Sequence, residues 1–208
     1  MAAGNGKLVT TMEQLLGLYE APSDVSVAKE IDHVSEHYRA FIEAAPFFAL
    51  ATGGPDGLDC SPRGDAPGFV RVADRQTLMI PDRRGNNRID SLRNIMRDPC
   101  VALLFLIPGI GETIRVIGRA ALSIDADLLA SFAVNGKAPC CVIVVTVERV
   151  FYQCTKAIVR SKLWDPARHV DRKSLPTTGT SRAAHTAGRL GGDAHDRGQL
   201  ERTLAKLY

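Results

Sequence analysis

The sequence of 208 residues has few aromatic residues, only 6%, and no long apolar stretch. No run approaches the roughly 18 apolar residues that a membrane-spanning helix needs, so we expect no membrane association. The segment Met1–Thr10 lacks the apolar core of a signal peptide, which favours a cytoplasmic protein. The net charge of +3 is small, whereas proteins that bind nucleic acids usually carry a dense basic face. We therefore expect no nucleic-acid partner.

Cysteine is scarce, and its spacing matches no known framework. The five cysteines contain no C-x-x-C pair, and the two adjacent ones cannot easily bridge each other. An odd, scattered set of this kind predicts neither a disulfide framework nor a zinc site, but small free thiols in a reducing compartment. They are Cys60, Cys100, Cys140, Cys141 and Cys154.

Common catalytic motifs are also missing. The sequence has no G-x-S-x-G, no H-E-x-x-H, no Walker loop and no G-x-G-x-x-G. The stretch Gly109-Ile110-Gly111 begins like a dinucleotide loop, but no third glycine follows and the next residues open a strand. His33 and His37 have the i, i+4 spacing of metal ligands, yet no third ligand lies near them. We expect a solvated helix face there, and no metal.

The composition that remains, 45% hydrophobic and 24% charged, is typical of a globular protein. Residues 11–45 are predicted to be helical, because apolar residues recur with helical period from Val27 to Ile42. From Phe47 the pattern changes to about six short strands separated by turns, which predicts an α+β fold with a small antiparallel barrel. The predicted strands are 47–52, 59–72 (bulged or looped), 77–81, 101–107, 112–122 and 142–147, with 150–154 continuing the last one after a kink.

Short helices are expected between and after these strands, at 88–97, 125–132 and 155–162. The last 40 residues are rich in Thr, Gly, Ala, Arg and His, and only 200–207 there is predicted to be helical. These patterns divide the chain into three parts. They are an N-terminal helical extension (1–45), the barrel (46–166) and a loosely packed C-terminal appendage (167–208).

A polar loop between residues 80 and 94 is the first candidate binding site. It leads into a helix, and a helix N-terminus offers unpaired N–H groups and the positive end of a dipole, which favour a phosphate. Arg88 and Arg63 would add bidentate bonds, and Asn87 and Ser91 would add neutral donors. The alternative is a capped surface helix with incidental arginines, and the residues alone do not decide between the two.

The second candidate is the single tryptophan, Trp164, which stands between Lys162 and Asp165. These charged neighbours favour a position near the surface, where an indole ring can stack on a planar ligand. A core position is the alternative.

Five sequence blocks together resemble the pyridoxamine 5′-phosphate oxidase-like flavoproteins, and more narrowly a bacterial subgroup that depends on flavin mononucleotide (FMN) and whose substrates are mostly unassigned. The resemblance spans about residues 25–170. It implies a split β-barrel that forms a homodimer with FMN at the subunit interface. The blocks are Ser61–Asp65, Leu78–Asn94, Phe105–Gly109, Gly111–Ala120 and Arg160–Pro166.

Carried over by position, the resemblance implies roles for ten residues. Arg63 and Arg88 would hold the FMN phosphate, assisted by Asn87 and Ser91. Pro81 and Asp82 would run along the isoalloxazine ring.

The remaining four positions lie later in the chain. Thr113 stands where the oxidase proper has an amide side chain that faces the ring, so this sequence departs from the family pattern there. Lys156, Arg160 and Trp164 would come from the partner subunit or close the pocket.

The resulting expectation is an FMN-dependent oxidoreductase that acts on an unidentified small molecule. Because the flavin itself supplies hydride chemistry, no acid–base constellation is needed. One alternative is a reductase of the same fold that uses the deazaflavin F420. Haem is disfavoured, because no histidine falls within 47–164. Another alternative is a non-catalytic flavin-binding protein.

Overall fold

The computed structural model describes residues 8–55 and 57–208. Asp56, which belongs to a predicted turn, and residues 1–7 of the segment considered as a signal peptide lie outside this part. The chain divides into two compact units, residues 1–30 and 31–208, and each is described by itself.

The first unit contains two short helices, α1 (Met12–Leu16) and α2 (Asp24–Ala28). Thr11 caps α1 by accepting a hydrogen bond from the Gln14 N–H. Neither helix has a buried residue. The region 11–45 was predicted to be helical, with a break at Pro22–Asp24. The structure divides the part after this break further, into α2 and a separate helix from Glu36, because amphipathic spacing alone does not form a long helix without a surface to pack against.

The second unit begins with Ile31, which pairs with Val150 through two main-chain hydrogen bonds. This extended pairing interrupts the predicted helical stripe. Helix α3 (Glu36–Ala44) then begins at Ser35, whose hydroxyl accepts from the Tyr38 N–H. The sequence assigned this helix to an N-terminal extension, yet it packs against strands of the sheet and adds Ile42 to the core.

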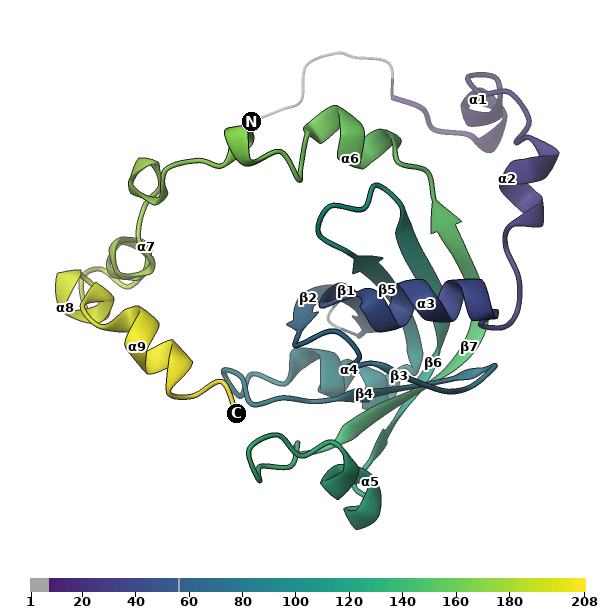
Figure 1. Cartoon of the computed structure of the whole chain (residues 1–208). Coiled ribbons are helices and arrows are strands. Elements are labelled where there is room, and N and C mark those ends of the chain that lie inside the picture. Colours follow the sequence, from purple (N-terminus) through teal and green to yellow (C-terminus); the bar gives the residue numbers. More distant parts are fainter. Residues whose placement is uncertain (1–7, 56) are drawn as a thin grey trace. The chain divides into compact units, whose positions relative to one another are not determined.

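Seven antiparallel strands form one curved sheet in the order β2-β1-β5-β6-β7-β4-β3 (Figure 1). The edge strands β2 and β3 do not pair with each other, so the sheet is not closed, as in a split barrel. The predicted α+β class is confirmed, with one strand more than expected. The strands are β1 (Phe47–Gly54), β2 (Gly57–Gly64), β3 (Arg71–Asp74), β4 (Thr77–Pro81), β5 (Cys100–Leu106), β6 (Thr113–Ser123) and β7 (Val142–Gln153).

The core lies on the inner face of this sheet, where alternate residues of neighbouring strands meet. Phe48 of β1 is fully buried, with its ring centroid 5.0 Å from that of Phe105 on β5. Ile95 of α4 (Asp90–Arg97) is also buried in this core, and α4 contacts β1, β2 and β6. The helix that was predicted to carry the phosphate site is therefore anchored to the sheet.

The kink predicted near residue 150 is a β-bulge. Ile117 pairs with Arg149 and Gly118 with Val147, which leaves Glu148 as an extra residue on β7. A Cβ atom on Gly118 would collide with the carbonyl oxygen of Thr146. Only glycine allows the two strands to approach this closely here.

The other helices include α5 (Ala126–Ser131) and α6 (Lys156–Ser161), both close to their predicted positions. The C-terminal segment contains α7 (Thr178–His185), α8 (Asp193–Asp196) and α9 (Gln199–Leu204). Sequence analysis missed α7, whose Gly, Thr and Ser content opposes helix formation. A side-chain cap supports it, since Thr177 accepts from the Thr180 N–H.

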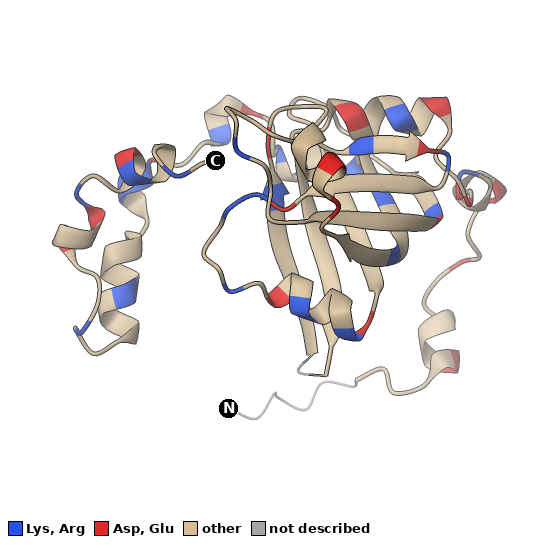
Figure 2. Cartoon of the chain, turned by 90° about the horizontal axis from the view of Figure 1, so that it is seen from below, with Lys and Arg blue, Asp and Glu red and all other residues tan. Residues whose placement is uncertain are grey.

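Charges of both signs are interspersed over the molecule, in keeping with the small net charge (Figure 2). No helix among the described residues is long and apolar enough to cross a bilayer.

Candidate functional site

The inner edge of β2 carries a row of polar side chains. Asp59, Ser61 and Arg63 are two residues apart, so they lie on the same face of the strand, and all three are partly buried. This face is turned toward α4 and toward the segment that follows β4. Arg63 was predicted from sequence, whereas Asp59 and Ser61 were not chosen, although the period of two was visible in the block Asp59–Arg63.

Ser91, in the first turn of α4, joins this row. Its hydroxyl donates to Asp59 at 2.8 Å and lies 3.1 Å from Ser61 Oγ, and Ser61 Oγ donates to Asp59 at 2.9 Å. Ser91 is only 2% exposed. Its hydrogen bond, followed by that of Ser61, lowers the pKa of Asp59 below the usual value. Asp59 is therefore a carboxylate at neutral pH, and it accepts the hydrogen bond that the Ser91 hydroxyl can donate.

Arg63 makes the second contact between β2 and the rest of the site. Its Nη1 lies 2.5 Å from Oδ1 of Asp82, just after β4, and both side chains are largely buried. The Nε–H of Arg63 is buried without a hydrogen-bond partner among the described residues. An unsatisfied buried donor on a charged group costs free energy, so a ligand that accepts from it would be stabilised.

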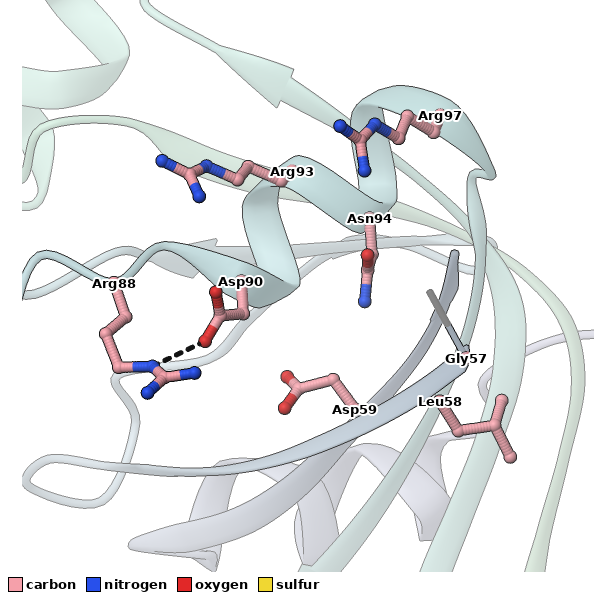
Figure 3. Close-up of a pocket in the computed structure, with 8 residues that line it drawn as sticks. All are labelled: Gly57, Leu58, Asp59, Arg88, Asp90, Arg93, Asn94 and Arg97. Atoms are coloured by element: carbon pink, nitrogen blue, oxygen red, sulfur yellow. Dashed lines mark hydrogen bonds and ion pairs between the residues drawn. The ribbon is translucent and has the colours of Figure 1, made fainter. Parts of the chain in front are cut away.

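A cavity of about 300 Å³ opens beside this row, between the start of β2 and α4 (Figure 3). Arg88 Nε lies 2.7 Å from Asp90 Oδ2 in its wall, and the Arg88 side chain is 75% exposed. The carboxylate of Asp59 and the amide of Asn94 point into the space between strand and helix. Arg93 and Arg97 complete the cationic part of the wall.

The loop before α4 has an unusual backbone. Asn87 and Ile89 both adopt left-handed conformations, with φ of 59° and 53°. Asparagine tolerates this conformation, but a β-branched isoleucine rarely adopts it. Such strain persists only where the surroundings impose it, and it is frequent in binding loops. The loop therefore holds Arg88 between two left-handed residues, of which Ile89 is the strained one, at the start of the helix.

The residues predicted to face the flavin ring divide between two places. Pro81 is buried at the end of β4, and Asp82 next to it is paired with Arg63. Thr113 begins β6, where it pairs with Gln153, and it lies three strands away from Arg63 in the sheet order β2-β1-β5-β6. In a single chain the structure does not bring Thr113 beside Arg63.

The residues that were predicted to come from the partner subunit lie near the start of β6, and not near Arg63. Trp164 is half-buried and its Nε1–H donates to the carbonyl of Ile110, in the loop before β6, at 2.7 Å. Lys156 and Arg160 are exposed on α6. The ten predicted residues thus form two groups, one around Arg63 and one around Trp164.

No group of three His, Cys, Asp or Glu side chains in the described part of the chain is arranged to hold a metal ion. The chemistry available at the site is therefore that of arginines, hydroxyls and carboxylates. The segment 82–97 contains five arginines and two aspartates. A cationic loop of this kind, beside an unsatisfied arginine N–H, fits a phosphate group.

Comparison with solved structures finds several similar chains. HupZ from Group A Streptococcus is 18% identical, with 58% of this chain and 94% of that chain covered and a TM-score of 0.48. An FMN-binding protein from Syntrophomonas wolfei is 12% identical, with coverages of 55% and 82% and a TM-score of 0.43. An F420 reductase is 20% identical, with coverages of 58% and 98% and a TM-score of 0.40. These values are too low to indicate a shared ligand.

No curated protein matches the sequence. One family model does match, over residues 34–154, which is more than half of the chain and includes all seven strands. Its description is pyridoxamine 5′-phosphate oxidase. The chain therefore belongs to the pyridoxamine 5′-phosphate oxidase family.

Proposed function

We propose that this protein binds FMN through its phosphate at Arg63 and acts as an FMN-dependent oxidoreductase on a small molecule. The observation that carries the proposal is the buried Nε–H of Arg63, which has no acceptor among the described residues. Asp82 engages another nitrogen of the same guanidinium, so the side chain is already held in place for an anion. The resemblance of the sequence blocks to FMN-dependent family members supports this choice of anion.

The residues around Arg63 differ in how well they could bind a phosphate. Arg88 is exposed and adds a second positive charge from the loop before α4. Asn87 precedes it with an exposed side chain. Ser91 donates its hydroxyl hydrogen bond to Asp59, so we assign it to positioning the strand against the helix rather than to direct donation to the phosphate. The negative charges of Asp59 and Asp90 restrict an anion to the Arg63 side of the helix start.

FMN, when bound, supplies a hydride acceptor and donor, and the residues of this chain would orient it and set the polarity around the ring. Pro81 presents a rigid, apolar surface at the end of β4. Thr113 offers a hydroxyl as the hydrogen-bond donor to a ring atom, in the place where the resemblance implies an amide side chain in the oxidase proper.

The proposal includes a homodimer with FMN between the subunits. In one chain, Thr113 lies three strands away from Arg63, and we infer that a second chain supplies α6 to the same ligand. Apolar side chains around α6 support such an interface, because Val159, Leu163 and Ile110 are 66%, 45% and 39% exposed. Exposed apolar residues that cluster in this way mark interaction sites.

The test begins with the absorption spectrum of the purified protein and the mass of any compound released on denaturation. We expect flavin bands and FMN. Ligand-free protein should take up added FMN at micromolar concentration, and light scattering should give twice 22.5 kDa. Rapid reduction of the bound flavin by NADH or NADPH in stopped-flow measurements would support turnover.

Protein that binds no FMN, or that takes up F420 instead, would contradict the cofactor assignment. A mass of 22.5 kDa at every concentration would contradict the dimer. Flavin that binds but is reduced by neither nucleotide nor any substrate tried would contradict the oxidoreductase and indicate a flavin-binding protein without turnover.

A further inference from the structure

A second cavity, of about 780 Å³, lies between the barrel and the C-terminal helices. Its barrel wall is formed by the end of β2 and the loop after β4, and its other wall by residues of α7 to α9 and the segment that follows. None of its lining residues lines the cavity beside α4. Its volume is in the range of small-molecule sites.

The C-terminal wall is attached to the barrel through Tyr208. The Tyr208 hydroxyl donates to Oδ1 of Asp65 at 2.6 Å, and Nζ of Lys137 donates to the main-chain oxygen of Tyr208 at 2.8 Å. Asp65 is held from the other side by Arg83, whose Nε lies 2.7 Å from Oδ2, and its side chain is only 5% exposed. We call these three contacts, of Tyr208 with Asp65, Tyr208 with Lys137 and Asp65 with Arg83, the C-terminal anchor.

The charge in this cavity is strongly unbalanced. Five cationic side chains line it, whereas Asp65 is the single acidic side chain among its lining residues. The cationic residues are Arg83, Arg84, Arg182, Arg202 and Lys206. The whole chain carries a net charge of only +3. Like charges gathered around one space repel each other, and an anion between them relieves this repulsion.

Several of these cations have no protein partner that would satisfy them. Within the described residues, the side chains of Arg84 and Lys206 make no hydrogen bond or ion pair. Arg182 contacts only Nδ1 of His195, at 3.4 Å, which does not neutralise its charge. These three side chains are exposed and available to a ligand.

We propose that this cavity binds a small organic polyanion, which bears either phosphate groups or several carboxylates. Arg84 binds the ligand from the barrel loop after β4, whereas Arg182 and Lys206 bind it from the C-terminal segment. Arg182, in α7, and Lys206, in the turn after α9, both lie beyond residue 154, where the match to the family ends. The site thus depends on this chain's own C-terminal segment, and neither Arg63 nor Asp82 of the proposed phosphate site is among its lining residues.

Isothermal titration calorimetry of the FMN-saturated protein tests the proposal, with pyrophosphate as the phosphate probe and citrate as the carboxylate probe. We expect at least one probe to bind once per chain, and the tighter one identifies the class of anion. The variant with Arg84→Ala, Arg182→Ala and Lys206→Ala should bind it at least about tenfold more weakly, because each substitution removes a charge-assisted contact. All three positions are exposed, so the fold should be retained, as circular dichroism would verify.

Arg189→Ala is the matched control. Arg189 is an exposed arginine of the same segment, its Nε donates to the carbonyl of Thr186, and it does not line the cavity. The control should leave the affinity unchanged within about twofold, since surface charges away from a site are screened by salt.

Three results would overturn the proposal. The first is that neither probe binds. The second is an equal loss of affinity in the Arg189 variant, which would show diffuse attraction instead of a site. The third is binding that is seen only without FMN, which would assign the anion to the FMN site. Because calorimetry detects the anion directly, a failure to bind FMN would not be mistaken for a failure of this site.

Discussion

Arg63 and Asp82 form a largely buried ion pair, 2.5 Å apart, that leaves the Nε–H of Arg63 buried and without an acceptor. Asp82 is itself anchored, because its N–H donates to the carbonyl of Cys141 on the neighbouring segment. The pair connects an edge strand to the loop that carries the other arginines. It therefore orients a guanidinium before any ligand arrives, which reduces the entropy lost on binding.

The first prediction concerns Arg63. Arg63→Ala should weaken FMN binding about tenfold or more, because it removes a charge-assisted bond from a site shielded from water. Arg63→Lys should recover only part of this affinity, since an ammonium group lacks the planar fork of donors. Titration of ligand-free protein followed by flavin fluorescence measures both.

Arg75→Ala provides the control for Arg63, because Arg75 is exposed in the turn between β3 and β4 and belongs to no cavity wall described above. It should bind FMN as the wild type does. Equal affinities for wild type and Arg63→Ala, with both folded, would show that the phosphate binds elsewhere.

The second prediction concerns Arg88, which is 75% exposed and already pairs with Asp90. Arg88→Ala should reduce FMN affinity less than Arg63→Ala does, by about two- to tenfold, and the effect should shrink as salt is added. Titrations at low and high ionic strength measure this difference. A salt-independent loss larger than that of Arg63→Ala would reverse the roles assigned to the two arginines.

The sheet could be predicted from the sequence because its strands are short, β-branched and bounded by strong turns. Residues 77–81 and 142–153 illustrate this, since both match observed strands closely. The helix predicted from the apolar stripe between Val27 and Ile42 is interrupted, because Ile31 pairs with Val150 as a β-bridge instead of continuing the helix. Periodicity does not reveal such long-range competition.

The candidate site was predictable only in part, for a similar reason. The motif blocks predicted Arg63, Arg88 and Ser91 as site residues, but the sequence around a residue does not reveal which distant residue it contacts. The ion pair of Arg63 with Asp82 spans 19 positions, and the hydrogen bond of Ser91 to Asp59 spans 32. The contact of Tyr208 with Asp65 spans 143 positions, and nothing in the polar C-terminal sequence indicates it.

The third prediction is a pH dependence of the C-terminal anchor. Burial alone would raise the pKa of Asp65, but hydrogen bonds from Tyr208, the Ala66 N–H and Arg83 outweigh it, so the pKa lies below its ordinary value. A lowered carboxyl pKa stabilises the fold above the ordinary pKa near 3.8, and this contribution is lost as the pH falls through the lowered value. The same hydrogen bond raises the pKa of Tyr208 above 10, so its contribution is lost at alkaline pH.

Thermal melts at a series of pH values test this anchor. Asp65→Asn should lower the stability at neutral pH by about 1–3 kcal/mol, because it weakens a nearly buried hydrogen-bonded carboxylate, and should flatten the acid limb of the curve. Tyr208→Phe should have a smaller effect, since Arg83 still holds Asp65. Curves for Asp65→Asn and wild type that run parallel down to acid pH would contradict the assigned pKa shift.

The last prediction concerns the thiols. Cys141 is buried, and this burial, with the nearby negative charge of Asp82 as a smaller cause, raises its pKa to about 11. Because the thiolate is the reactive form, Cys141 should not react with a thiol reagent at pH 8 until the protein unfolds. Cys60, Cys140 and Cys154 are exposed and should react fast, whereas Cys100 should react more slowly, because hydrogen bonding to Asp98 raises its pKa. Titration with a chromogenic disulfide should therefore show three fast thiols, one slower thiol and one protected thiol. Asp98→Asn should bring Cys100 into the fast group without exposing Cys141, and five equally fast thiols in the folded protein would contradict the burial of Cys141.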